Sequence, residues 1–144
     1  MLRALIVDDD PVNSRFLLEI LSPYAACDTA GNGREGLDAF GRALGAGTPY
    51  DVIFVDVMMP GMDGHQALEG MRHLEHERGV SSSDAAKVIM ISALDDTRNV
   101  YRAFFQGQAL TFLAKPFTCD AVLAELRKFD IIGRPAPVAP RSDA

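Results

Sequence analysis

The chain contains 144 residues with a formal net charge of −6, and 48% of its residues are hydrophobic while 24% are charged. These values are typical of a globular domain, and the length suits one domain with one core. The acidic balance, with 3 Lys and 11 Arg, argues against a nucleic-acid partner, which needs a basic face. No apolar run approaches the roughly 20 residues of a membrane-spanning helix, so we expect no membrane insertion. The 2 cysteines argue against a disulfide scaffold and fit a reducing compartment, so we expect a cytoplasmic protein.

The first half of the chain begins with a short apolar strand, predicted at residues 5–7. A helix should follow and extend to about Leu21, because Asp10 stands at an N-cap position and Pro11 at the first helical position. The apolar face of this helix is expected to contain Val12, Phe16, Ile20 and Leu21. A weak strand is predicted at 26–30. The apolar positions of the next helix are Leu37, Phe40, Ala43 and Leu44.

The second half contains the clearest strand, predicted at residues 52–55, whose unbroken apolar run is typical of a strand buried on both faces. The helix that follows has its apolar positions at Ala67, Leu68, Met71 and Leu74. Further strands are predicted at 88–91 and 110–114, with a helix between them after Asp95–Asp96. The apolar positions of the last helix are Val122, Leu126 and Phe129.

This order is a strand followed by a helix, five times over, which predicts an α/β domain with a parallel sheet covered by helices on both faces. We expect the domain to occupy residues 1–132. Residues 133–144 contain three prolines among small residues and are predicted to be a flexible Pro/Ala-rich tail.

Chemically useful side chains stand where the predicted strands end. They are Asp8, Asp9, Asp56, Ser92 and Lys115. Taken singly, most have ordinary explanations as loop acids or as a surface lysine, although a carboxylate at the end of a strand as apolar as 52–55 is costly unless it is paired or bound to a metal. Together these five side chains are a more specific sign of function, because binding sites of open α/β sheets lie at the carboxyl ends of the strands.

Converging carboxylates favour protonation or the binding of a cation, and hard oxygen ligands suit Mg²⁺. An ionised Asp beside Mg²⁺ can attack phosphorus and form an aspartyl phosphate.

The sequence resembles the receiver domain of two-component response regulators over about residues 2–130, in a single-domain form similar to the chemotaxis regulators. The matching motifs are Asp8–Asp9, Asp56, the segment 59–64 (MPGMDG), Ser92–Ala93 and Lys115–Pro116–Phe117. The resemblance implies a flavodoxin-like, doubly wound (βα)5 fold with strand order 2-1-3-4-5. It also implies a signalling switch rather than an enzyme, with weak self-phosphatase activity.

The resemblance further implies that Asp56 is the phosphoacceptor, and that the donor is the phosphohistidine of a sensor histidine kinase or a phosphotransfer protein. Asp9 would bind Mg²⁺ directly and Asp8 through a water molecule. Asp56 and the backbone carbonyl of Met58 would complete the protein ligands. Lys115 would contact the phosphoryl group.

Switching would involve Ser92, whose hydroxyl moves toward the phosphoryl group in this family, and Phe112, which occupies the family's aromatic switch position. Phe112 lacks the hydroxyl of the Tyr often found there. The output surface would consist of the predicted fourth helix, the last strand and the last helix. Apolar residues of the fourth helix cover more than one of its sides, so two alternatives stand: a tilted helix buries all of them, or Tyr101 or Phe105 stays exposed and contacts a downstream protein or a second copy of the chain.

The lifetime of an aspartyl phosphate depends on a water held in line with the bond that breaks. The side chains best placed to hold that water are two residues after the acceptor and two after the hydroxyl residue, which are Met58 and Leu94. Neither can accept a proton, and both are bulky enough to cover the phosphoryl group. We therefore expect slow self-hydrolysis.

Three other interpretations of the chain remain open to different degrees. It could be a receiver cut from a longer hybrid kinase or transcriptional regulator, with the same chemistry and another output. A haloacid-dehalogenase-type enzyme would need a second Asp two residues after the nucleophile, where this chain has Met58. A receiver that binds partners without phosphorylation is disfavoured by the complete set of site residues. Finally, His73 and His76 lack a third metal ligand and are expected on a solvated helix face.

Overall fold

The computed structural model describes residues 2–93 and 109–133. Five strands form one parallel sheet in the order β2-β1-β3-β4-β5. The strands are β1 (Leu2–Val7), β2 (Ala25–Ala30), β3 (Val52–Asp56), β4 (Lys87–Ala93) and β5 (Thr111–Lys115). The helices in the described ranges are α1 (Pro11–Leu21), α2 (Gly33–Gly45), α3 (Gly64–Glu77) and α5 (Cys119–Lys128). The α/β class and the strand order are therefore as predicted, while the helix expected after Asp95–Asp96 lies outside the described ranges.

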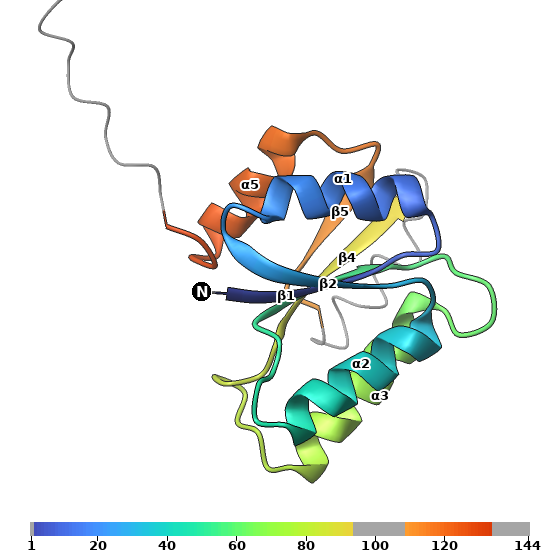
Figure 1. The fold of residues 1–144 in the computed structure, drawn as a ribbon, viewed down its shortest axis with the longest axis vertical. Coiled ribbons are helices and arrows are strands. Elements are labelled where there is room, and N and C mark those ends of the chain that lie inside the picture. Colours follow the sequence, from blue (N-terminus) through green and yellow to red (C-terminus); the bar gives the residue numbers. More distant parts are fainter. Residues whose placement is uncertain (1, 94–108, 134–144) are drawn as a thin grey trace, which may run out of the picture.

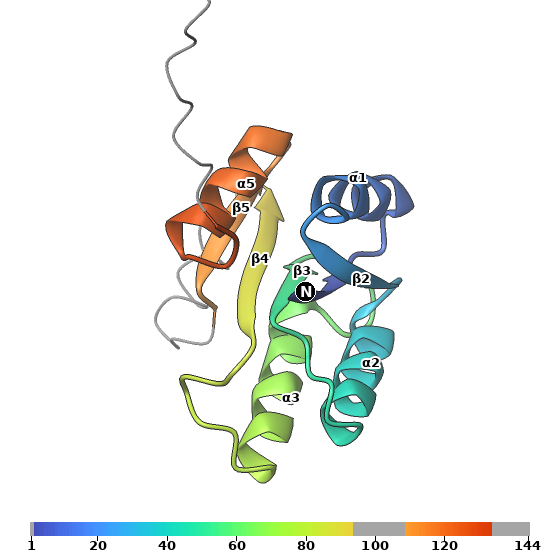
Figure 2. The ribbon, with the colours of Figure 1, turned by 60° about the vertical axis from the view of Figure 1, so that its left-hand side comes forward.

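Helices cover both faces of the sheet (Figures 1 and 2). α1 and α5 lie on one face, and α2 and α3 lie side by side on the other. Each strand of the central part contributes to both cores in alternation: Ile53 and Val55 face α2 and α3, whereas Val52 and Phe54 face α1 and α5. This two-sided burial explains why β3 is an unbroken apolar run rather than an alternating one.

The start of α1 is as predicted, because the Asp10 side chain accepts a hydrogen bond from the Val12 amide at 2.9 Å and Pro11 is the first helical residue. Its predicted apolar face is partly wrong. The helix buries Leu17, Ile20 and Leu21, whereas Val12 is 73% exposed and Phe16 is 38% exposed. The buried residues have the i, i+3, i+4 spacing of a single apolar stripe. Val12 and Phe16 lie outside this stripe and are not needed for packing against the sheet.

The strand boundaries differ slightly from the prediction. β4 extends one residue earlier and two residues later than the predicted 88–91, and β5 is shifted by one residue to Thr111–Lys115. The added residues are polar or small and pair in register, with Ser92 opposite Ala114 and Ala93 opposite Lys115. The pairing places Ser92 and Lys115 on neighbouring strand ends. No helix in the part of the chain that the structure describes is long and apolar enough to cross a membrane.

Candidate phosphoacceptor site

Three carboxylates converge at the carboxyl edge of the sheet, as predicted. Asp8 follows β1, Asp9 is the next residue, and Asp56 ends β3. One carboxylate oxygen from each lies within 4.8 Å of the others. Asp8 is 2% exposed and Asp56 3% exposed, while Asp9 is open to solvent. Parallel pairing of β1 with β3, which sets Val7 opposite Val55, delivers both strand ends to one place.

Backbone amides hold the two buried carboxylates. The Asp10 amide donates to Asp8 Oδ1 at 2.9 Å, and the Met58 amide donates to Asp56 Oδ1 at 3.1 Å. Asp8 Oδ2 is buried and accepts no hydrogen bond among the described residues. A buried carboxylate oxygen without a donor is costly, and a cation would satisfy it.

Lys115 at the end of β5 is the site's cation. Its ammonium nitrogen lies 2.7 Å from Asp56 Oδ2 and 3.9 Å from Asp8 Oδ2. Burial lowers the pKa of Lys115, but the hydrogen bond and charge of Asp56, together with Asp8 and Asp9, raise it above its ordinary value. The ammonium therefore stays charged.

Burial raises the pKa of Asp8 to about 7, and the nearby charge of Asp56 adds to this. The hydrogen bond from the Asp10 amide and the charge of Lys115 act in the opposite direction but are outweighed. Two acids and one ammonium thus leave an excess of negative charge that favours either a proton or a divalent cation. Three carboxylates, one with a free buried oxygen, fit the oxygen-only ligand set of Mg²⁺.

The predicted switch residues flank this site on β4 and β5. Ser92 is buried, and its hydroxyl donates to the carbonyl of Ala93 at 3.2 Å. Phe112 is half-buried against the core under α2 and α3. The structure therefore brings Ser92 to the carboxyl edge beside Lys115, whereas Phe112 lies three residues further back on β5.

Met58 and Leu94 are the two residues predicted to control the water that attacks the phosphoryl group. The Met58 side chain is 65% exposed, although Met58 lies only two residues after the buried Asp56. Leu94 lies outside the described residues, as do Tyr101 and Phe105.

Glycine 64 allows the loop after Asp56 to close tightly. Its amide donates to the Val57 carbonyl at 2.9 Å, and a Cβ at this position would lie 2.8 Å from the Val57 Cα and even nearer to the Asp56 carbonyl oxygen. Asp63 and Gln66 form a reciprocal capping box at the start of α3. From the sequence, Gly64 was assigned only to the segment 59–64, and its contact with the acceptor's own backbone was not predicted.

A scan against known protein families supplies the identification. The model described as "Response regulator receiver domain" matches residues 4–127. The chain belongs to this family. The match covers β2 to β5 in full, β1 from Ala4 onward, and the strand ends at which the acidic residues lie.

Individual receiver-domain relatives cover the same region. The chain is 34% identical to the chemotaxis protein CheY of Treponema pallidum over 126 residues, which are 86% of this chain and 79% of that protein. It is 31% identical to the transcriptional regulatory protein PcoR of Escherichia coli, covering 88% of this chain but only 50% of that protein. The chain thus spans half the length of one relative and most of another.

Among solved structures, the CheX-CheY-BeF3-Mg²⁺ complex from Borrelia burgdorferi is similar, with a TM-score of 0.73 and 27% identity. The alignment covers 90% of this receiver and 89% of that chain. The name of that complex includes Mg²⁺, in agreement with the ligand chemistry of the acidic triad here.

The alternative metal site is not supported. His73 pairs with Glu77 at 2.9 Å on the exposed face of α3, as predicted for a solvated helix surface. Within the described residues, the acidic triad is the only group of three or more potential ligands close enough to hold an ion.

Proposed function

We propose that this receiver is a phosphorylation-controlled signalling switch in which Asp56 takes a phosphoryl group from a phosphohistidine. The supporting observation is the position of Asp56, a buried carboxylate that shares its site with two further carboxylates and one ammonium. In the reaction a new bond forms between a carboxylate oxygen of Asp56 and phosphorus, and the phosphorus–nitrogen bond to the donor histidine breaks. The imidazole leaves with the electron pair and takes up a proton.

Mg²⁺ would be held by Asp8, Asp9, Asp56 and the Met58 backbone carbonyl, and when bound it neutralises charge on the phosphoryl oxygens. Lys115 holds a phosphoryl oxygen with an ammonium that already lies against Asp56. Ser92 exchanges its hydrogen bond with the Ala93 carbonyl for one to the phosphoryl group. The resulting shift at the end of β4 changes the packing of Phe112 and so the surface offered to partners.

The phosphodonor would dock beside the site on the exposed turns of α1. Val12 and Phe16 are exposed there, and the Phe16 ring stacks on Phe117 with centroids 5.7 Å apart. This stack joins α1, which begins two residues after Asp9, to the loop that follows Lys115, and adds to the apolar surface at this end of α1. A helical donor domain with an apolar surface would bury this end of α1 while presenting its phosphohistidine to Asp56.

The output is proposed to be a protein contact on the face of α5, β5 and the segment before β5, much of which lies outside the described residues. We propose that the protein is a switch that does not turn over a substrate. We also propose that it is located in the cytoplasm. Because the chain covers only half of a transcriptional relative, a covalently attached output domain in the natural gene product is the second possibility, and the length of that product decides between them.

The test is phosphorylation by acetyl phosphate with Mg²⁺, followed by intact-mass measurement. Asp56→Asn should abolish the mass increase of one phosphoryl group, whereas the native chain should gain it. Asp10→Asn is the matched control, because it makes the same substitution in the neighbouring loop and Asn still caps α1. Full labelling of Asp56→Asn would show that Asp56 is not the acceptor.

A further inference from the structure

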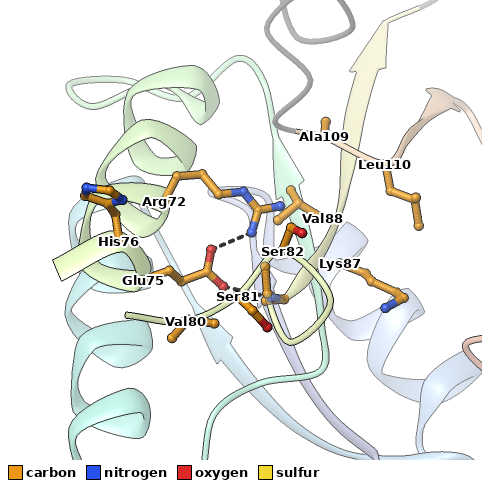
Figure 3. A pocket seen from close by; sticks show the side chains of 12 residues that line it. Arg72, Glu75, His76, Val80, Ser81, Ser82, Lys87, Val88, Ala109 and Leu110 are labelled. Atoms are coloured by element: carbon orange, nitrogen blue, oxygen red, sulfur yellow. Dashed lines mark hydrogen bonds and ion pairs between the residues drawn. The ribbon is translucent and has the colours of Figure 1, made fainter. Parts of the chain in front are cut away.

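A second pocket lies at the opposite end of the sheet from the carboxylates (Figure 3). It has a volume of about 480 Å³ and is bounded by the end of α3, the connection after it, and the starts of β4 and β5. This volume falls within the range of roughly 300–1,000 Å³ that small-molecule sites occupy. One wall is apolar and includes Val80, Val88 and Leu110. The proposed phosphorylation chemistry uses none of these residues.

The pocket's acid is already neutralised. Glu75 is buried, and its Oε1 lies 2.6 Å from Arg72 Nη1. Its Oε2 accepts a hydrogen bond from the Ala86 amide at 2.8 Å. Figure 3 shows Arg72 and Glu75 joined on the α3 side, with Leu110 across the pocket from them. Both oxygens of the carboxylate are therefore occupied and its charge is balanced.

Hydrogen bonds hold the connecting segment in place. The Val80 amide donates to the Glu75 carbonyl at 3.0 Å, and the Asp84 amide donates to the Ser81 carbonyl at 3.0 Å. Together with the bond between Glu75 and the Ala86 amide, these contacts fix both ends of the segment 79–86. The pocket is thus formed before any ligand enters, which lowers the entropy cost of binding.

One cation at the pocket is not balanced. Lys87 lines the pocket, is exposed, and has no carboxylate within ion-pair distance in the part of the chain that the structure describes. The exposed Ser82 also lines the pocket, whereas the Ser81 hydroxyl is engaged with the Asp84 carboxylate at 3.1 Å. The pocket therefore places one positive charge without an ion-pair partner in the described residues beside an apolar wall.

We propose that this pocket binds a small organic anion with an apolar body, its head at Lys87 and the Ser82 hydroxyl and its body against Val80, Val88 and Leu110. The anionic head is the shared chemistry of a carboxylate and a phosphate monoester. This proposal does not depend on phosphorylation of Asp56.

The test uses amide chemical shifts of the full ¹⁵N-labelled chain during titration with hexanoate, phenyl phosphate, and hexanol as the neutral control. Saturable shifts within 80–88 and at 109–110 are expected with at least one acid and not with hexanol. Hexanoate binding alone identifies a carboxylate ligand, and phenyl phosphate binding alone identifies a phosphate ligand. Equal binding of hexanol, shifts centred elsewhere, or no saturation with either acid would overturn the proposal.

Two variants locate the head group. Lys87→Gln should weaken binding about fivefold, the scale expected for one partly exposed ion pair. Ser82→Asp, also at an exposed rim position, should weaken it by placing a like charge in the site. Lys128→Gln on α5 is the matched control, since it removes the same charge from an exposed position outside the pocket. If Lys128→Gln weakens binding as much as Lys87→Gln does, the interaction is general electrostatics and the assigned site is wrong.

Discussion

The ammonium of Lys115 lies 2.7 Å from Asp56 Oδ2 and 3.9 Å from Asp8 Oδ2, so one cation serves two buried carboxylates. Both acids belong to the central strands of the sheet, and the lysine comes from the edge strand β5. The ion pairs of Lys115 therefore link the edge strand of the sheet to its two central strands. Removing this cation should leave the two acids to repel each other, and that repulsion should be relieved by a divalent ion.

We predict that Lys115→Gln lowers the free energy of unfolding by about 2 kcal/mol in Mg²⁺-free buffer, the scale of a hydrogen bond to a charged group. Added Mg²⁺ should stabilise this variant more than the native chain, because the lysine no longer competes for the carboxylates. Urea unfolding with and without Mg²⁺ measures both effects. The control is Lys87→Gln, which removes the same charge from an exposed lysine without an ion pair in the described residues and should match the native chain. Equal gains from Mg²⁺ in the Lys115 variant and the native chain would contradict the competition.

Metal binding should depend on Asp9 and not on its neighbour Asp10. Asp9 belongs to the acidic triad, whereas the Asp10 side chain caps α1. Asp9→Asn should weaken Mg²⁺ binding about tenfold or more, because it removes a full charge at ligand distance. Asp10→Asn removes the same charge nearby and keeps the cap, so its affinity should stay within about twofold of the native value. Isothermal titration with Mg²⁺ gives both constants, and similar losses in the two variants would place Asp9 outside the ligand set.

Much of this arrangement could be predicted because the relevant signals are local. The apolar run of β3 and the Asp10–Pro11 start of α1 both depend on neighbours in the sequence. Once the alternation of strands and helices is known, the rule that parallel strands end at one edge places Asp8 with Asp56.

The parts that were wrong or missed depend on tertiary packing. Periodicity placed Phe16 on the buried face of α1, but the stripe at Leu17, Ile20 and Leu21 satisfies the sheet, and Phe16 packs against Phe117 instead. The burial of Glu75 was not predicted, because it depends on the Ala86 amide, which only the folded chain brings to this carboxylate.

The close contact at Gly64 should make this position intolerant of a side chain. Gly64→Ala would press a Cβ against the backbone of Asp56 and Val57, which cannot rotate away, and should cost about 1–3 kcal/mol of stability. Gly41→Ala is the control. Gly41 lies in the middle of α2, where Ala is the better helix former, and its added Cβ would make an ordinary contact with the Leu74 side chain of α3. Thermal unfolding should show a lower midpoint for the first variant only. Comparable midpoints would mean that the loop after Asp56 moves freely.

The lifetime of the aspartyl phosphate should be set at Met58 and Leu94. Met58 is 65% exposed beside the buried acceptor, so its side chain is free to cover a phosphoryl group without disturbing the core. Its thioether is a weak acceptor and cannot orient an attacking water, and the Leu side chain has no polar atom. The aspartyl phosphate of the native chain should therefore hydrolyse slowly, and that of a Met58→Asn, Leu94→Glu double variant should hydrolyse faster, because polar groups can align the water.

Loss of the phosphorylated mass with time, in excess Mg²⁺ after removal of acetyl phosphate, measures the two rates. Val12→Asn, an exposed polar substitution at the start of α1, is the control and should decay at the native rate. Decay of the double variant at or below that rate would show that these two positions do not control the water.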